Sequence, residues 1–228
     1  KDCWNAVEFT VPDTKGDQIA ELGYLIFTPA GTASRVFGRI FMDDFKVGGE
    51  ADYSIDMSLQ AVEFAQITPF SLNQCTGELV DGRLIVSSEG ECQLFTGNYY
   101  SKDICLEADI APIKGARKGL ILRGKGAECF YMLGFGELGE AVIAKRDFGT
   151  KLLARAEYDW KAFEKYKLKA SAVGNLLTLW INGEKILEAV DDSFNYGMVG
   201  FFQEEAGSFI TERLQIKTGE GRGIERII

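Results

Sequence analysis

Histidine is absent from all 228 residues of the sequence. This absence excludes a Ser-His-Asp triad, a Cys-His pair and a histidine-ligated zinc site. Any catalysis would therefore depend on carboxylates. The five cysteines are an odd number without C-x-x-C spacing, which excludes a full disulfide framework and a zinc ribbon. No apolar run approaches the roughly 18 residues that a membrane span requires.

Basic residues are in deficit, with 25 Lys and Arg against 34 Asp and Glu, which gives a net charge of −9. Such a chain repels phosphate, so neither nucleic acid nor a membrane is expected as a partner. The odd cysteine count favours a reducing compartment, and we expect a cytoplasmic location. The N-terminus has neither a starting Met nor a signal peptide, so we expect a piece of a larger protein whose compartment stays open.

Alternation with a period of two dominates the sequence. From Lys165 to Val173, lysines alternate with apolar residues, which is typical of an antiparallel strand with one solvated face. The apolar segment from Leu176 to Ile181 is followed by Asn182-Gly183, a dipeptide that favours a type I′ hairpin turn. Similar segments separated by glycines continue through the chain, and together they predict an all-β sandwich or barrel.

The predicted strands fall into two blocks. Residues 1–52 contain three strands, too few to bury a core alone, so we expect this short N-terminal β segment to pack on the following domain. Residues 53–219 contain the strands of the main sandwich. Residues 220–228 are rich in glycine and charge and predict a flexible tail.

Several segments carry a family resemblance. They are the turn-bounded strand at 80–86, the Trp-led strand at 158–171, the hairpin at 179–187 and the strand at 196–202. Together they resemble laminin-G-like, concanavalin-A-like jelly rolls. Among these they look most like the 3-keto-disaccharide hydrolase-like domain and the C-terminal accessory domain of bacterial ADP-ribosylglycohydrolase-like proteins. The resemblance implies a jelly-roll fold.

The N-terminal block resembles the last strands of a galactose-binding-like β-sandwich, at residues 7–12, 19–26 and 38–49. That tail before a laminin-G-like domain is the order found in the long ADP-ribosylglycohydrolase-like proteins. The resemblance therefore implies a parent chain whose catalytic domain is a partner of this module. The Asp-rich, dimetal catalytic helices of that family have no counterpart in this sequence.

Aromatic residues are the candidates for carbohydrate binding, because sugar rings stack on aromatic rings while polar groups bond the hydroxyls. Tyr99, Tyr100 and Tyr196 lie in predicted loops, where packing does not readily explain an aromatic side chain. Trp180 is a further candidate, but it lies in a strand that is apolar on both faces, so burial between the layers is its expected role. Trp160 is expected to plug the core.

Three aspartates are candidate ligands for a structural calcium ion. Asp43 and Asp44 resemble the position of a calcium ligand in galactose-binding-like modules, where backbone carbonyls would complete the site. Asp191 lies in an Asp-Asp-Ser turn at the expected rim of the sandwich. Bonding of local backbone N–H groups by this turn is the alternative.

A catalytic carboxylate motif is incomplete. Glu107 and Asp109 share one face of a strand, as in jelly-roll glycosidases, but the third carboxylate is replaced by Ala111 or Pro112. We therefore expect a non-catalytic accessory module that binds carbohydrate. The alternatives are a glycoside hydrolase that uses loop carboxylates, like the 3-keto-disaccharide group, and a structural docking or spacer domain.

Overall fold

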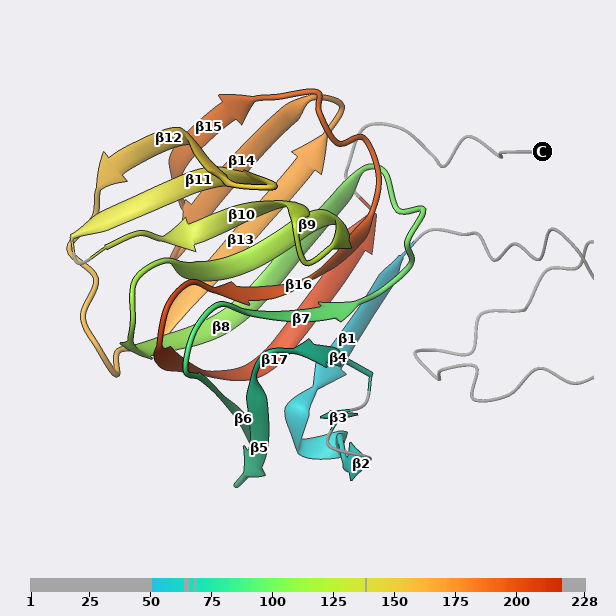
Figure 1. The fold of residues 1–228 in the computed structure, drawn as a ribbon, viewed down its shortest axis with the longest axis vertical. Coiled ribbons are helices and arrows are strands. Elements are labelled where there is room, and N and C mark those ends of the chain that lie inside the picture. The colour runs from blue at the N-terminus through green and yellow to red at the C-terminus, as the bar shows by residue number, and fades with distance from the viewer. Residues whose placement is uncertain (1–50, 64–65, 68, 138, 219–228) are drawn as a thin grey trace, which may run out of the picture. The chain divides into compact units, whose positions relative to one another are not determined.

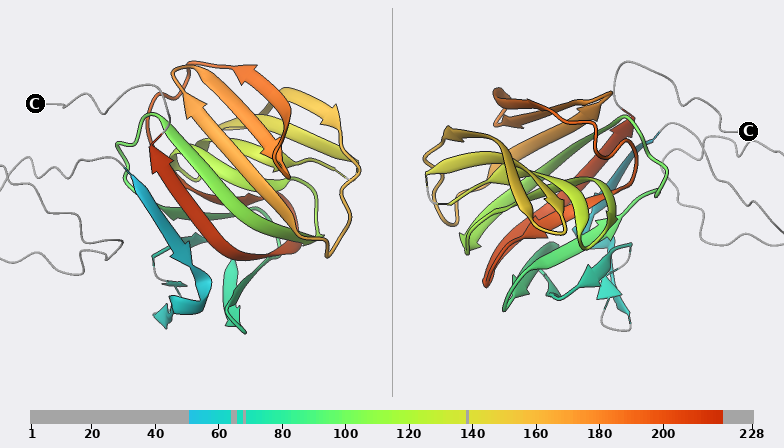
Figure 2. Two further views of the ribbon diagram at one scale, coloured as in Figure 1. Left: turned by 180° about the vertical axis from the view of Figure 1, so that it is seen from behind. Right: turned by 45° about the horizontal axis from the view of Figure 1, so that its top comes forward.

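The computed structural model describes residues 51–218, apart from 64, 65, 68 and 138. Two antiparallel sheets of these residues stack face to face as a sandwich (Figures 1 and 2), which confirms the predicted all-β jelly-roll fold. The N-terminal block, with Asp43 and Asp44, and the tail lie outside the described residues. The described part of the chain holds no helix with the length and hydrophobicity for a membrane crossing.

The eight-stranded sheet has the order β15-β14-β13-β8-β17-β6-β5, and β1 also pairs with β17. One edge of β17 is shared, because β6 pairs with residues 207–211 and β1 with residues 213–217. The strands are β1 (Asp52–Asp56), β5 (Thr76–Val80), β6 (Arg83–Ser88), β8 (Ile104–Lys114), β13 (Tyr166–Val173), β14 (Leu176–Ile181), β15 (Glu184–Val190) and β17 (Gly207–Thr218).

The seven-stranded sheet has the order β12-β11-β10-β9-β16-β7-β4 and faces the viewer in Figure 1. Its strands are β4 (Ser71–Asn73), β7 (Cys92–Thr96), β9 (Lys118–Gly126), β10 (Cys129–Phe135), β11 (Glu140–Asp147), β12 (Thr150–Glu157) and β16 (Met198–Gln203). The 3-10 helix η1 (Met57–Leu59) follows β1, and a short hairpin is formed by β2 (Val62–Glu63) and β3 (Gln66–Ile67).

The core lies between the two sheets, as the alternation predicts. In β13, Leu168 and Ala170 are fully buried against the opposite sheet, while Lys167 on the other face is exposed and forms an ion pair of 2.7 Å with Glu107. The lysine row is therefore the solvated outer face of the eight-stranded sheet. Burial of one apolar row per strand supplies the main free energy that holds the layers together.

Trp160 packs into the core against Phe135, which confirms its predicted role. The residue is buried, and its indole N–H donates to the Glu137 carbonyl at 3.1 Å. The ammonium of Lys118 lies 4.8 Å from the Trp160 ring centre and donates to the carbonyls of Gly115 and Ala116. Burial lowers the pKa of Lys118 to about 8, because the charged form has lost its water.

The outer face of the seven-stranded sheet is concave. The ring centres of Phe95 in β7 and Phe130 in β10 are 6.3 Å apart, although β9 and β16 lie between these strands. In a flat sheet, strands three places apart are separated by about 14 Å. The curl therefore brings the side chains of this face together, and it buries a second, smaller apolar cluster: Phe95, Ile121, Phe130, Met132, Val142, Ala144 and Phe202.

Candidate functional site

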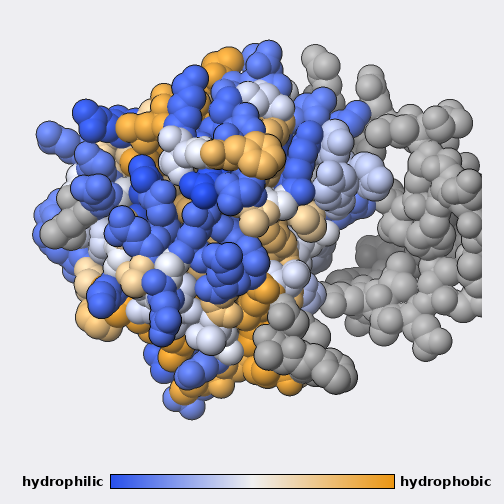
Figure 3. All heavy atoms as spheres, in the orientation of Figure 1, coloured by the Kyte–Doolittle hydropathy of each residue, from blue (hydrophilic) through white to orange (hydrophobic). Residues whose placement is uncertain are grey.

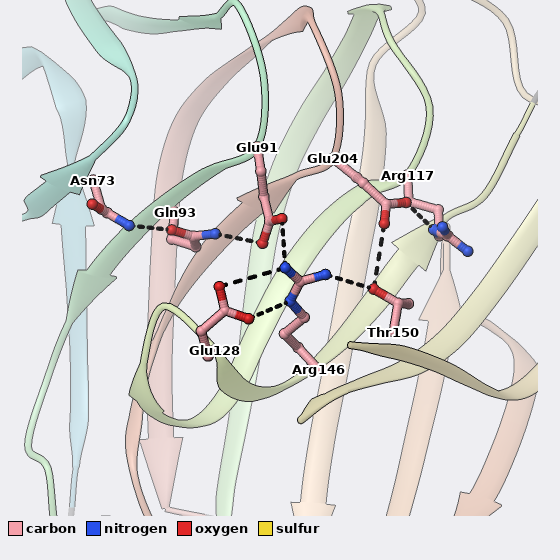
Figure 4. A network of polar contacts seen from close by, with 8 residues as sticks. All are labelled: Asn73, Glu91, Gln93, Arg117, Glu128, Arg146, Thr150 and Glu204. Carbon is pink, nitrogen blue, oxygen red and sulfur yellow. Dashed lines mark hydrogen bonds and ion pairs between the residues drawn. The ribbon is translucent and has the colours of Figure 1, made fainter. Parts of the chain in front are cut away.

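A continuous polar network lies on the concave face (Figure 4). Its centre is Arg146, at the end of β11. The guanidinium contacts Glu128 at 3.0 Å, Glu91 at 2.9 Å and the hydroxyl of Thr150 at 3.0 Å. These partners come from the β9–β10 turn, the β6–β7 loop and the start of β12, so Arg146 joins segments that are distant in sequence.

The network continues on both sides of Arg146 (Figure 4). On one side, Thr150 donates to Glu204 at 3.4 Å, and Glu204 forms a hydrogen-bonded ion pair with Arg117. On the other, Gln93 donates to Glu91 at 2.9 Å, and Asn73 donates to Gln93 at 2.5 Å. The network therefore holds three carboxylates, two guanidiniums and neutral polar groups in fixed positions.

These charged side chains are partly exposed, between 16% for Glu204 and 47% for Glu128. Figure 3 shows that hydrophilic residues predominate across the middle of this face. Burial raises the pKa of Glu91, and the neighbouring Glu128 and Glu204 add to this effect, while Arg146 opposes it. An ionised carboxylate accepts about four hydrogen bonds, so the network retains acceptors for a ligand.

Phe148 lies at the tip of the β11–β12 hairpin, two residues from both Arg146 and Thr150. Its side chain is 82% exposed, and its backbone has a φ of +51°, a left-handed conformation that a bulky residue rarely adopts. Its N–H donates to the carbonyl of Glu128 at 3.1 Å, which fixes the tip against the network. Strained backbone conformations cluster at functional sites, so Phe148 marks this part of the concave face as a candidate ligand site.

The network was not predicted from the sequence. Glu91 and Arg146 are 55 residues apart and meet only because the sheet curls. The available signal was Asp147-Phe148-Gly149, a turn tripeptide with an aromatic residue at its centre.

The predicted tyrosines do come together. Tyr99 and Tyr100 lie in the β7–β8 loop, and Tyr196 lies in the segment before β16, at the same end of the sandwich (Figure 1). The ring centre of Tyr99 lies 5.3 Å from that of Tyr100 and 5.6 Å from that of Tyr196, and both pairs have edge-to-face geometry. Tyr100 and Tyr196 are stacked at 6.1 Å. We call these three residues the tyrosine cluster.

Trp180 does not join the tyrosine cluster. It lies on the outer face of the eight-stranded sheet, where the Lys169 ammonium is 4.9 Å from its ring centre. The ring is partly exposed, so the expectation of burial between the layers is wrong. Only the other face of the strand, with Leu177, Leu179 and Ile181, points into the core.

Asp191 lies at the rim and bonds protein donors. It accepts from the Tyr131 hydroxyl at 2.6 Å, the Lys145 ammonium at 2.9 Å and the Ser193 N–H at 2.9 Å. Burial opposes ionisation of the carboxyl, but these hydrogen bonds outweigh it and hold the pKa of Asp191 well below its usual range. This is the local bonding that the sequence left as an alternative. Among the described residues, no group of three or more Cys, Asp or Glu could hold a metal ion.

The predicted carboxylate pair lies away from the concave face. Glu107 and Asp109 are on the outer face of the eight-stranded sheet, beside a shallow depression of about 510 Å³. Asp109 lines this depression together with Asp56, Asp81, Glu212 and two arginines.

Solved structures share this fold. A carbohydrate-binding module from Bacillus subtilis superposes with a TM-score of 0.60 at 19% identity, covering 66% of this chain and 96% of that one. A Bacillus subtilis protein of unknown function with a galectin-like fold gives 0.55 at 15% identity, covering 77% and 98%. The fold is galectin-like. Domain 4 of an extracellular arabinanase from Geobacillus stearothermophilus, solved with arabinotriose, gives 0.53 at 9% identity and covers 77% and 95%.

No protein-family model matches the chain, and no curated protein sequence does. The identities of these three neighbours are below 20%, so the likeness is one of fold.

Proposed function

We propose that this protein is a non-catalytic carbohydrate-binding module that binds glycan on the concave face of its seven-stranded sheet. The observation that carries the proposal is Phe148, an exposed aromatic side chain at a hairpin tip whose flanking residues belong to the Arg146 network. Carbohydrate sites combine an aromatic platform with fixed polar groups, and the concave face offers both. Two proteins that share the fold, the carbohydrate-binding module and the arabinanase domain solved with arabinotriose, support the same class of function.

The charge of the network favours a neutral ligand. Three carboxylates and two guanidiniums alternate along it, so hydrogen-bond acceptors and donors lie side by side. A polyhydroxylated sugar donates and accepts through the same hydroxyl groups, so it can use both kinds of partner. A phosphate or a polycation would meet repulsion from one sign of charge.

The network is also preorganised. Each charged group is already held by an oppositely charged or polar neighbour, so little side-chain entropy is lost when a ligand binds. The Phe148 tip is fixed in the same way, by its hydrogen bond to Glu128.

We also propose that this module is part of a longer protein. The resemblance of residues 1–52 to the end of a galactose-binding-like module supports a place in a longer ADP-ribosylglycohydrolase-like chain. A cytoplasmic location and a structural calcium at Asp43 or Asp44 stay predictions.

A glycan-array screen of the purified chain, followed by calorimetry on the sugars that bind, tests the proposal. Phe148→Asn is the informative variant, because Asn tolerates the left-handed conformation but offers no stacking ring. We expect the affinity to fall roughly tenfold. The free energy of unfolding should rise by about 1 kcal/mol, because the strain is relieved.

Phe163→Asn is the matched control. Phe163 is also exposed, at 72%, and has a φ of +66°. It lies in the β12–β13 loop, however, where its N–H donates to the carbonyl of Pro112. This variant should gain similar stability and keep full affinity. Equal affinity of Phe148→Asn and the original chain would refute the proposed site, and turnover of a bound glycoside would favour the hydrolase alternative.

A further inference from the structure

The proposed site on the concave face does not include the tyrosine cluster. Tyr100 is 63% exposed and Tyr99 38% exposed, on loops that carry no other exposed large apolar residue. Burial cannot explain aromatic side chains that remain this accessible, because most of their apolar surface still meets water. Exposed aromatic residues that gather at one place mark a binding surface more often than single ones do.

Hydrogen bonds fix the backbone of the loops that carry the cluster. The Tyr100 N–H donates to the Asn98 side chain at 2.8 Å, and the Ser101 N–H donates to the Asn98 carbonyl at 3.2 Å, which closes a tight turn. The Gly197 N–H donates to the Ser101 carbonyl at 2.9 Å and so ties the loop of Tyr196 to that of Tyr100. The two loops that carry the rings are therefore joined before any ligand arrives.

Lys125 also contacts the cluster, through the ring of Tyr196. The Lys125 ammonium lies 4.2 Å from the Tyr196 ring centre and 5.7 Å from that of Phe194, which is buried in the core. The Tyr196 ring thus contacts both the Lys125 ammonium and the stacked ring of Tyr100. The exposed surface of this stack belongs mainly to Tyr100, which is the ring available to a sugar.

The β9–β10 hairpin, which carries Lys125, contacts both the cluster and the concave site. Lys125 and Glu128 belong to the same β9–β10 hairpin and are three residues apart, so their Cα atoms are separated by at most about 11 Å. Lys125 contacts the tyrosine cluster, and Glu128 bonds both Arg146 and the backbone of Phe148. The tyrosine cluster and the concave site therefore contact the same hairpin, so an oligosaccharide that runs along this hairpin would meet both.

We propose that Tyr100, held by Tyr99 and Tyr196, is a second sugar-stacking platform, so that the module binds an extended neutral oligosaccharide rather than a single terminal sugar. This inference rests on the proposed function. It assigns the polar network and Phe148 to the first sugar residues, and the tyrosine cluster to residues further along the same chain.

Calorimetry with ladders of neutral arabino-, xylo-, cello- and manno-oligosaccharides, from monosaccharide to octasaccharide, tests the extension. With the ladder that binds, we expect the affinity of the original chain to rise with length, and Tyr100→Ala to lose that gain, roughly tenfold for the longest member. The same variant should bind the shortest ligands normally. Phe163→Ala, which removes an exposed ring elsewhere, should behave like the original chain at every length.

The two proposals fail differently in this experiment. If Phe148→Asn loses binding at all lengths while Tyr100→Ala matches the original chain throughout, the concave site stands and the second platform is refuted. If no ladder is bound by the original chain, both proposals fall. If Tyr100→Ala changes only the oligomeric state in sedimentation, the cluster is an interface between copies and the second platform is again refuted.

Discussion

At the scale of single residues, polar groups near the sandwich interior are stabilised by specific partners. Lys145 is nearly buried, and its ammonium bonds Asp191 and the hydroxyl of Ser193. The Tyr131 ring is fully buried and donates its hydroxyl to the same carboxylate. Burying any one of these polar groups without a partner would be costly, so the hydrogen bonds among them fix the rim segment 191–194.

Asp191→Asn should therefore destabilise the protein by about 3 kcal/mol at neutral pH, because it leaves the Lys145 charge without its counterion. The pKa of Asp191 is lowered in the folded state, so its stabilising effect is complete above the unfolded pKa, near 3.9, and is lost as the pH falls below it. Denaturant unfolding of both proteins should show a constant difference above about pH 5 that narrows below pH 4.

Asp159→Asn is the control for this prediction. Asp159 is exposed and pairs with Lys161 at the surface, so its loss should change stability by less than about 1 kcal/mol. A difference between Asp191→Asn and the original chain that persists undiminished to pH 2 would contradict the assignment.

At the scale of elements, the curl of the seven-stranded sheet depends on glycine. Gly119 in β9 and Gly134 in β10 are directly paired. A Cβ on Gly119 would lie 2.3 Å from the Leu133 carbonyl oxygen, and one on Gly134 would lie 2.4 Å from that of Lys118. The two strands approach so closely that no side chain fits, and this approach helps the sheet to close around the concave face.

Gly134→Ala should cost at least about 2 kcal/mol of folding free energy, because the obstacle is backbone rather than a flexible side chain. Gly90→Ala is the control, since nothing lies within 4 Å of the added Cβ. Chemical denaturation measures both. Equal stability of the two variants would show that β9 and β10 can separate without loss.

At the scale of the whole molecule, a net charge of −9 and a neutral ligand predict binding that is insensitive to salt. Screening acts on charge–charge attraction, and a neutral sugar offers none over long range. We expect the affinity for the bound glycan to change by less than about twofold between low and high sodium chloride. A steep loss of affinity with salt would indicate a charged ligand and contradict the proposed chemistry.

Much of the fold was determined by the sequence alone, because it depends on local periodicity. The alternation around Lys167 fixes which face of β13 is wet, and the Asn182-Gly183 turn has the positive φ values, 52° and 84°, that a type I′ hairpin needs. The loop tyrosines were also identified, because an aromatic residue in a predicted turn is unusual wherever the loop finally lies.

The candidate site was decided by the tertiary structure. Nothing local shows which sheet curls, and the sequence pattern of Trp180 is the same for a buried and an outward-facing strand position. Arg146, Glu91 and Glu204 lie on three different segments and meet only when five strands are in register and the sheet is bent. The sequence thus determined which residues face water, while curvature, which depends on contacts between distant strands, determined which of them meet.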